Sequence, residues 1–561
     1  MLERKYSFDE NGQHNEDNGS ENMIIRGDNL EALKALLPRY EGRVKCIYID
    51  PPYNTGNEGW VYNDNVNDPK IKKWLGEVVG KEGEDLTRHD KWLCMMYPRL
   101  KLLQKLLADA GVIFISIDDN ELYNLKAICD EIFGSNNFVA NVIWQKTYSP
   151  RNDALGIPYE TDNILVYSKT GRWFPNKLER TAAMDERHDS PDNDPIPWQS
   201  GDVSAAGAAD HQGMVYAIQQ PITGKLLYPA SGRHWKDEQT VVLQRMNKWA
   251  KYELRNIDDA SVRAALCGIS IESVRQDVMA VMLAQPIEEA TVQATARYEE
   301  GTWPEYYFTS KGKGGIRFKN HIKQDVGKSA TNLWFYGDVG HTDEAKKELK
   351  GIFSGVAPIE TPKPRRLIER ILHIAADSNA IILDSFAGSG TTAHAVLNMN
   401  KADGGHRKFI LVEMMDYADS ITAERVKRVI RGYGEGKNAV EGTGGNFSFY
   451  DLGEPLLHGD VLNENVGVEK IREYVYFTDT KASLPESHPD EPYFMGVHIG
   501  SAYYFYYEKQ AVTTLNREFL HTVKTEADAY VIYADLCTLS EAELEKYHIT
   551  FKKIPRDITK L

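Results

Sequence analysis

The sequence predicts an α/β protein with an open, mixed β-sheet, an inserted domain and a small C-terminal α/β domain. Two observations support this class. Apolar runs rich in β-branched residues alternate with helical patterns over residues 23–170 and again over 331–445. Between them, residues 171–330 are rich in Gly, Pro, Asp and Trp, and the alternation stops. We expect the two α/β segments to share one sheet, with the middle segment inserted as a separate domain.

Length and composition indicate an ordinary globular chain of several domains. Its 561 residues are too many for one core, and 42% are hydrophobic and 26% charged. The five cysteines are scattered without a C-x-x-C pair, so neither a disulfide framework nor a zinc site is expected. No apolar stretch reaches about 18 residues, and no leader is expected from Met1–Lys5. A cytosolic protein is therefore expected.

The net charge of −16, taken alone, favours a small-molecule enzyme over a nucleic-acid-binding protein. Total charge describes the whole surface, however, and a DNA-facing cleft would occupy only a minor part of it. Basic residues clustered on one face are the better indicator. The acidic balance therefore does not exclude DNA as a partner.

The first 22 residues are expected to form a mobile lead-in, because residues 9–22 are polar and acidic and repeat Asn and Gly. Order is expected to begin near Met23. Gly27-Asp28-Asn29 precedes apolar residues at helical spacing, which predicts a helix capped by Asp28. Asp28 could serve only as that cap, or it could also line a ligand cleft.

The stretch around which the chain is organised is a strand and the turn that ends it. Cys46–Asp50 is apolar up to its last residue, which predicts a buried parallel strand. Pro51 and Pro52 end the strand, since neither can donate to a sheet ladder. Asp50 and Tyr53 are thus expected at the carboxyl edge of the sheet, where open α/β sheets bind ligands. The alternative is a plain strand and turn, with Asp50 capping a local group and Tyr53 merely packed.

These side chains suit methyl transfer to an amino group of a nucleobase. The exocyclic nitrogen is a poor nucleophile because its lone pair is delocalised into the ring. The Asp50 carboxylate and the Pro51 carbonyl could accept its two N–H bonds and free the lone pair for in-line attack on an electrophilic methyl group. Tyr53 could stack on the base, an interaction of about 1–3 kcal/mol.

Further elements are predicted downstream of the turn. Residues 54–84 are rich in Asn, Asp and Gly and could form a gate over the base or an ordinary surface loop. A helix is predicted from Thr87 to Asp109, ended by Gly111. The remaining predicted elements of this half are a strand over 112–117, a helix over 120–133 and a hairpin of strands 141–146 and 163–168.

Basic and aromatic residues gather near the end of the middle segment. The aromatic residues are Tyr306, Tyr307 and Phe308, and the basic residues are Lys311, Lys313, Arg317, Lys319, Lys323 and Lys328. This combination suits contact with phosphates and bases, as on a DNA-facing surface. The alternative is a solvated loop whose lysines only increase solubility.

The second α/β segment carries a glycine-rich turn. A helix is predicted over Lys363–Leu372, followed by a strand over Ala380–Asp384. Gly388 and Gly390 then form a turn before a helix over Ala393–Asn398, which lets a ligand approach the backbone near the helix N-terminus.

Glu413 completes a predicted nucleotide site. It ends the next strand, Phe409–Glu413, and is placed to accept both hydroxyls of a ribose. The spacing Gly388-x-Gly390-x-x-Ala393 also fits the loose fingerprint of NAD- or FAD-binding proteins, which does not account for the upstream Pro-Pro turn. No G-x-x-x-x-G-K-[ST] sequence occurs, which excludes a P-loop.

These motifs resemble those of amino-group DNA methyltransferases. Asp50-Pro51-Pro52-Tyr53 resembles their catalytic motif, and Phe386-Ala387-Gly388-Ser389-Gly390 resembles their S-adenosylmethionine (AdoMet) motif. The catalytic motif preceding the cofactor motif resembles the β class. The wider sequence is similar to the modification (Mod) subunit of type III restriction-modification systems at Gly27–Leu33, Ile47–Gly56 and Thr361–Pro364.

The resemblance implies an AdoMet-dependent methyltransferase sheet (Rossmann-like) and assigns the segments. They are a lead-in (1–22), a catalytic half (23–170), a target-recognition domain (171–330), an AdoMet-binding half (331–445) and a C-terminal domain (446–561). The implied catalytic residues are Asp50, Pro51, Pro52 and Tyr53. The implied cofactor-binding residues are Asp28, Lys363, Asp384, Phe386, Gly388, Gly390, Thr391, Thr392 and Glu413. No metal site is implied.

The implied function is site-specific methylation of adenine N6 in double-stranded DNA, with the adenine flipped out of the duplex. In this superfamily, Asp at the first catalytic position favours adenine N6, whereas Ser favours cytosine N4. Cytosine-N4 methylation, methylation of structured RNA and a non-catalytic DNA-binding subunit remain alternatives.

The resemblance also implies partners and a location. The chain would be a bacterial cytoplasmic protein and would act with a separate restriction subunit or as an orphan methyltransferase. The C-terminal domain would mediate a homodimer, or it would be a packing appendage that only completes the fold.

Overall fold

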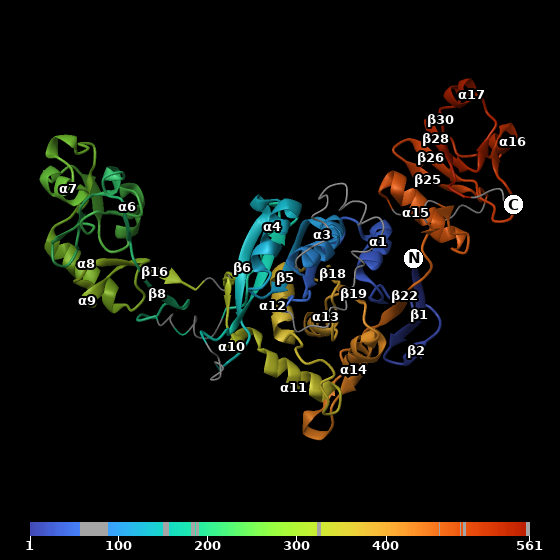
Figure 1. The fold of residues 1–561 in the computed structure, drawn as a ribbon. Helices are drawn as coiled ribbons and strands as arrows, with labels where there is room; N and C mark the ends of the chain where they lie inside the picture. The colour runs from blue at the N-terminus through green and yellow to red at the C-terminus, as the bar shows by residue number, and fades with distance from the viewer. Residues whose placement is uncertain are drawn as a thin grey trace. The chain divides into compact units, whose positions relative to one another are not determined.

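The structure is a computed structural model that describes residues 1–55, 88–149, 156–180, 186, 190–322, 327–458, 461–482, 484–485 and 490–556. The chain divides into two compact units, one formed by Met1–Asn176 with Ser329–Leu561 and the other by Lys177–Lys328 (Figure 1). Of the segment predicted as a gate, residues 54–84, all but Asn54 and Thr55 lies outside the described residues.

An eleven-stranded mixed sheet forms the centre of the larger unit. From one edge to the other its strands are β17 (Leu333–Trp334), β6 (Phe138–Gln145), β7 (Thr161–Ser168), β5 (Leu107–Ile117), β4 (Val44–Ile49), β18 (Ile381–Asp384), β19 (Lys408–Glu413), β3 (Met23–Arg26), β22 (Phe447–Leu452), β1 (Leu2–Asp9) and β2 (Gly12–His14). Neighbouring strands from β5 to β22 are parallel, whereas β7 and β1 pair antiparallel with their neighbours. The predicted hairpin is β6 with β7.

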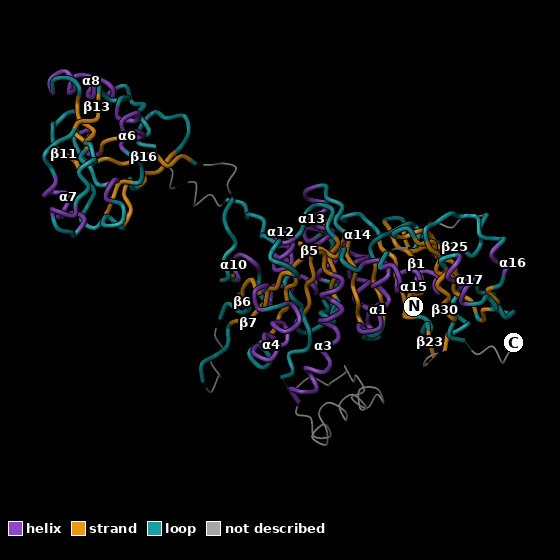
Figure 2. Tube along the Cα trace, turned by 90° about the horizontal axis from the view of Figure 1, so that it is seen from above, coloured by secondary structure: helices purple, strands orange, loops and turns teal. Residues whose placement is uncertain are grey.

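Helices cover both faces of this sheet. Figure 2 shows one group on one face, namely α1 (Asn29–Tyr40), α3 (Arg88–Leu106) and α4 (Leu122–Phe133). The other face carries α12 (Arg365–Ala375), α13 (Thr391–Asp403) and α14 (Glu424–Arg431). Leu33, Trp92, Leu100 and Ile113 are among the fully buried side chains between the first group and the sheet. Covering both faces explains why the central strands are apolar throughout, and the predicted α/β class is confirmed.

Local sequence explains where these helices begin. The Asp28 side chain accepts hydrogen bonds from the backbone N–H groups of Leu30 at 2.9 Å and Glu31 at 3.2 Å, so the predicted cap of α1 is confirmed. Pro364 occupies the cap position of α12 and has no N–H group to leave unsatisfied. The buried face of α12 carries Leu367, Ile371 and Ile374 at helical spacing.

Strands β4 and β18 lie side by side although more than 300 residues separate them in sequence. Ile382 pairs with Cys46, and Leu383 pairs with Ile47. The sheet continues from β4 to β5 on one side and from β18 to β19 on the other. The two halves therefore meet at a point where the strand order reverses, and α/β sheets open a ligand cleft at the carboxyl ends of such strands.

The N-terminal prediction is wrong for residues 2–14, because order begins at Leu2 and not near Met23. Strand β1 pairs with β22, which lies more than 400 residues later, and buries Tyr6 and Phe8. No local pattern reveals so distant a partner. A smaller correction concerns Gly111, which lies inside β5 because α3 already ends at Leu106. The residues before Val112 are accommodated by a shift of register against β4.

The second unit has its own aromatic core, which includes Trp198, Tyr216, Trp249 and Tyr306. One of its sheets has the order β15 (Tyr306–Phe308), β16 (Ile316–His321) and β8 (Trp198–Gly201). Another has the order β11 (Leu226–Leu227), β10 (Ile218–Gln219), β14 (Ala280–Leu283) and β13 (Tyr252–Arg255). Its longer helices are α6 (Gln239–Met246), α7 (Ala260–Cys267) and α8 (Ile287–Glu299).

Residues after β22 form a small α/β arrangement, as predicted. Its sheet has the order β25 (Phe494–His498), β26 (Ser501–Phe505), β28 (Ala529–Ala534) and β30 (Ile549–Lys553). Its helices are α15 (Val468–Thr480), α16 (Arg517–Leu520) and α17 (Glu541–Lys546). Its role in dimerisation stays a prediction. Over the described part of the chain, no helix has the length and apolar character needed to span a membrane.

Candidate active site

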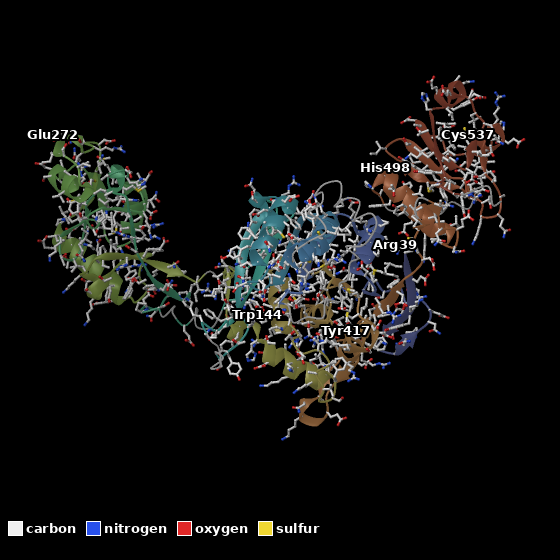
Figure 3. All side chains as sticks on the ribbon, viewed as in Figure 1. Arg39, Trp144, Glu272, Tyr417, His498 and Cys537 are labelled. Atoms are coloured by element: carbon white, nitrogen blue, oxygen red, sulfur yellow. The ribbon has the colours of Figure 1, made fainter. Side chains whose placement is uncertain are left out.

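A cavity of about 360 Å³ opens beyond the carboxyl ends of β4, β18 and β19. The predicted site residues that line it are Asp50, Pro51, Pro52, Tyr53, Lys363, Asp384, Phe386, Gly388, Thr391, Thr392 and Glu413. Tyr48, Thr361, Met415 and Tyr417 line it as well and were not predicted; Figure 3 labels Tyr417. The structure therefore brings the two predicted motifs into one cavity.

Two predicted residues, Asp28 and Gly390, do not line the cavity. Besides capping α1, Asp28 accepts a hydrogen bond at 3.0 Å from the fully buried Arg99 guanidinium. Gly390 has a φ of 79°, and a Cβ there would lie 3.0 Å from the Thr422 carbonyl oxygen. Asp28 therefore supports the start of a helix, and Gly390 allows close packing behind the glycine turn.

The Asp50 carboxylate is paired with Lys363. The Lys363 ammonium lies 2.6 Å from Asp50 Oδ1 and 2.5 Å from Oδ2. The same ammonium lies 5.0 Å from the centroid of the Tyr53 ring, within the range of a cation–π contact. The predicted catalytic carboxylate and aromatic ring thus share one cationic neighbour.

Two buried side chains, one from α3 and one from the residue before α4, hold the turn in place. The indole N–H of the fully buried Trp92, from α3, donates to the Pro52 carbonyl oxygen at 2.7 Å. Asn54, whose φ is 59°, donates through its side-chain amide to the carboxylate of Glu121. Glu121 precedes α4, is fully buried and also contacts His89 Nδ1 at 2.7 Å.

Trp92 and Glu121 were not predicted, because nothing in their local sequence points toward the turn. Only the packing of α3 and α4 against the sheet brings them there.

The glycine turn is tied to both neighbouring strand ends. The Asp384 carboxylate accepts hydrogen bonds from the Phe386 backbone N–H at 3.1 Å and from the Thr392 hydroxyl at 2.6 Å. The Glu413 carboxylate accepts from the Gly388 backbone N–H at 2.7 Å. Gly388 has a φ of 52°, and a Cβ there would meet no heavy atom nearer than 4.0 Å. The two carboxylates therefore hold the turn in place, and the space beside the Gly388 Cα is free for a ligand.

Burial changes the acidity of several cavity groups. Burial, with the nearby Asp50 and Glu413 carboxylates, raises the pKa of Asp384 to about 7, against the hydrogen bonds from Thr392 and Phe386. Burial also raises the pKa of Glu413. For Tyr53, burial and then the Asp50 charge raise the pKa of the phenol well above 10, so the ring stays neutral.

A buried cation supports the same turn from α14. The Arg425 guanidinium donates to the hydroxyls of Ser389 and Thr391 at 2.8 Å each, and it pairs with Glu348 at 3.3 Å. Burial lowers the pKa of Arg425 to about 10. This residue was not predicted either, because no signal in its helix distinguishes it from an ordinary surface arginine.

The predicted DNA-facing residues do not all reach the surface. Lys319 is 3% exposed, and its ammonium lies 2.5 Å from Asp192 and 2.7 Å from Asp194. Its assignment as a phosphate contact is wrong, because a buried ion pair occupies it. The aromatic residues Tyr306, Tyr307 and Phe308 are buried in the core of the second unit, so they do not interleave with the basic residues on a surface.

The exposed basic residues of the predicted set are Lys311, Lys313, Arg317 and Lys328. Lys323 lies outside the described residues. Contact of these side chains with DNA stays a prediction.

A model of the N6/N4 DNA methylase family matches residues 44–424, from the first residue of β4 to the first residue of α14. The match spans both motifs and the segment between them. The chain belongs to the DNA methylase family.

The chain is similar to Mod subunits of type III restriction-modification enzymes, and the predicted resemblance is confirmed. It is 31% identical over 450 residues to the StyLTI Mod subunit of Salmonella typhimurium LT2, covering 74% of this chain and 58% of that protein. It is 30% identical over 443 residues to the EcoP15I Mod subunit of Escherichia coli, covering 75% and 62%. The chain thus matches about three fifths of the length of these relatives.

A solved structure, that of the cytosine-N4-specific PvuII DNA methyltransferase, is 12% identical to this DNA methylase. The TM-score is 0.32, and the likeness covers 72% of this chain and 86% of that one. So slight a likeness adds nothing to the fold described above.

Proposed function

We propose that this DNA methylase transfers a methyl group from AdoMet to N6 of an adenine in duplex DNA, as a site-specific adenine-N6 methyltransferase. One observation carries the proposal. The Asp50–Tyr53 turn and the glycine turn, from distant parts of the sequence, line the same cavity of about 360 Å³. That volume lies within the range of about 300–1,000 Å³ typical of small-molecule sites.

The residues of the glycine turn fit AdoMet. The open space at Gly388 lets a ligand approach the backbone, as a nucleotide-binding turn requires. Glu413, at the end of β19, accepts a hydrogen bond from the Gly388 N–H and would also accept the ribose hydroxyls. Phe386, Thr391 and Thr392 would line the rest of the cofactor site. AdoMet supplies a methyl group on a sulfonium, which is electrophilic without assistance from a metal ion.

The Asp50–Tyr53 turn supplies the acceptor side. Asp50 would accept one N–H of the target amine and the Pro51 carbonyl would accept the other, which draws the nitrogen toward tetrahedral geometry. Tyr53, a neutral phenol, would stack on the base. The chain's task is to hold nitrogen and methyl carbon in line at near-attack distance, which is where positioning lowers the barrier.

The acceptor base must leave the duplex to reach Asp50. Flipping costs a few kcal/mol, offset by stacking and hydrogen bonds in the pocket. Asp at the first motif position favours adenine N6, and cytosine N4 is the second candidate because the same geometry can hold either amine. We propose that Lys311, Lys313 and Arg317, three exposed basic residues of the predicted set, contact phosphates.

The relatives suggest the setting. Because they are Mod subunits of restriction-modification enzymes, we propose that this chain marks DNA in a type III-like system, with a restriction subunit as partner, or alone as an orphan enzyme. A homodimer through residues 446–561 is part of the same proposal.

The test is transfer of tritium from methyl-labelled AdoMet to duplex DNA, followed by mass spectrometry of the nucleosides. We expect label in N6-methyladenine with the native chain and none with Asp50→Ala. Label in N4-methylcytosine would favour the second candidate. Binding of DNA without any methyl transfer would favour a non-catalytic subunit. Transfer to folded RNA but not to DNA would show that the substrate is RNA.

A further inference from the structure

The Lys363 ammonium occupies the place that the proposed function gives to the acceptor amine. It donates to both oxygens of Asp50 at 2.5–2.6 Å and lies 5.0 Å from the centroid of the Tyr53 ring. An adenine amine would need the same carboxylate, and its base would need the same ring face. The ammonium and the base would therefore compete for the Asp50 carboxylate and the Tyr53 ring, and we expect methyl transfer to require Lys363 to leave Asp50.

Lys363 also contacts the other half of the cavity. Its backbone carbonyl oxygen accepts a hydrogen bond from the Thr391 hydroxyl of the glycine turn at 3.4 Å. Pro362 and Pro364 flank it, and each fixes its own φ, so the backbone has little freedom at this point. The long, flexible side chain is thus anchored beside the cofactor half, while its ammonium reaches into the acceptor half.

Charge in the cavity indicates what could draw the ammonium away. Asp50, Asp384 and Glu413 are acidic, and Lys363 is the one Lys or Arg among the described residues that line the cavity. A ligand with a carboxylate, such as the amino-acid part of AdoMet, would find its opposite charge at Lys363. The acidic side chains would repel it in their ionised form.

We propose that Lys363 is a gate residue, which closes the acceptor site by pairing with Asp50 and opens it when the cofactor's carboxylate binds the ammonium. This inference rests on the proposed function and adds an order of events, in which cofactor binding prepares Asp50 for the base. Coupling between two sites is reciprocal in free energy. Weakening the Lys363–Asp50 pair must therefore strengthen cofactor binding.

Calorimetric titration of purified variants tests this. S-adenosylhomocysteine is the probe, because it keeps the carboxylate but has a neutral sulfur that Asp50 does not attract. Asp50→Asn is expected to tighten its binding about 5- to 10-fold, within the usual range of coupling between sites. Lys363→Met is expected to weaken it, and adding Asp50→Asn to Lys363→Met is expected to change nothing further.

Two controls isolate the gate. Methylthioadenosine has no carboxylate, so neither substitution should change its binding. Asp130→Asn breaks an Asp–Lys pair on α4, with Lys126 at 2.6 Å, and should leave both ligands unaffected.

The proposal is overturned if Asp50→Asn leaves S-adenosylhomocysteine binding unchanged, or if it changes both ligands equally. It is also overturned if a crystal structure with S-adenosylhomocysteine still has Lys363 paired with Asp50. That structure needs only the native chain, so the test survives if a variant fails to fold. A native chain that binds neither AdoMet nor S-adenosylhomocysteine would instead refute the proposed function, which keeps the two failures distinct.

Discussion

Carboxylates dominate the candidate site, and each has a different partner. Asp50 pairs with Lys363, Glu413 accepts from the backbone of Gly388, and Asp384 is buried beside a threonine hydroxyl. All three side chains are carboxylic acids, so it is their different surroundings that give them different roles. Asp50 is the carboxylate that an amine could reach once Lys363 moves, whereas Asp384 supports the glycine turn.

The raised pKa of Asp384 predicts a pH-dependent stability. The pKa of Asp384 is about 7 in the folded chain, whereas an ordinary aspartate, as in the unfolded chain, has a pKa of 3.8. Between these two pH values the folded chain therefore binds a proton that the unfolded chain has lost. The free energy of unfolding therefore falls as pH rises through this window and levels off above pH 7. Asp384→Asn should remove this contribution, which amounts to about 2 kcal/mol between pH 5.5 and 8.

Urea unfolding of both chains at pH 5.5 and 8 measures the effect. Relative to the native chain, Asp384→Asn should gain stability at pH 8. Thr392→Val keeps the Asp384 carboxyl but removes the hydroxyl that donates to it and lowers its pKa. The loss of stability between pH 5.5 and 8 should therefore be larger in this variant. If Asp384→Asn and the native chain differed in free energy of unfolding by the same amount at both pH values, Asp384 would not be the source of the pH dependence.

Asp28 tests whether a predicted cofactor residue acts only as a helix cap. Asp28→Ala should cost about 1–2 kcal/mol of stability, because α1 loses its cap and Arg99 loses a carboxylate partner. Asp28→Asn should keep most of the cap, since Asn is an equally good N-cap residue. Thermal unfolding and AdoMet titration distinguish the roles: loss of AdoMet affinity in a stable Asp28→Asn chain would return Asp28 to the cofactor site.

Among the secondary-structure elements, α3 and α4 have a function that their sequences do not reveal. Trp92 of α3 binds the Pro52 carbonyl oxygen, and Glu121, the residue before α4, binds the Asn54 side chain, so the two hold the turn on either side of Tyr53. A catalytic turn held to within a fraction of an ångström needs such support from rigid elements. These residues touch neither proposed substrate, so they are positioning residues.

Removing Glu121 should therefore impair transfer without impairing cofactor binding. Glu121→Ala leaves Asn54 and His89 without their shared acceptor, and kcat for methyl transfer is expected to fall about 10- to 100-fold, as for small misplacements of a reacting group. AdoMet affinity should be unchanged, and Glu121→Gln should recover part of kcat. Glu131→Gln, at an exposed position on α4, is the matched control. Equal losses of kcat and AdoMet affinity would indicate general unfolding of the site.

The order of elements was predictable where signals are local. The strand before Pro51, the cap of α1, the glycine turn and the strand ending at Glu413 follow from runs of a few residues. The strand β1 was not predictable, since its polar neighbours suggest a tail and its partner β22 is supplied by distant sequence. Burial of Lys319 was missed for the same reason, because Asp192 and Asp194 lie more than 120 residues earlier.

The molecule as a whole is acidic, but it could still bind DNA if basic side chains gather on the one surface that contacts the phosphates. Replacing Lys311, Lys313 and Arg317 by Gln should weaken binding to duplex DNA. It should also lower the slope of log affinity against log salt by up to about three, one for each lost phosphate contact. Fluorescence anisotropy over a salt series measures both.

A triple variant with the same charge change elsewhere is the control for this experiment. Lys509, Lys546 and Lys553 are exposed residues of the C-terminal region, and their replacement by Gln should leave the slope unchanged. Lys319→Gln should destabilise the second unit, because it removes the buried ammonium that pairs with both Asp192 and Asp194. If the native chain and the Lys311, Lys313 and Arg317 variant gave the same slope of log affinity against log salt, these three residues would not contact DNA phosphates.

The central claim is that two turns from opposite parts of the chain form one methyl-transfer site for adenine. The most direct measurement is the N6-methyladenine content of genomic DNA, read base by base, in a host without adenine methylation that expresses this chain. We predict methylated adenines at one recurring sequence with the native chain and none with Asp50→Ala. Unmethylated DNA with the native chain, or the same methylation with both chains, would contradict the account.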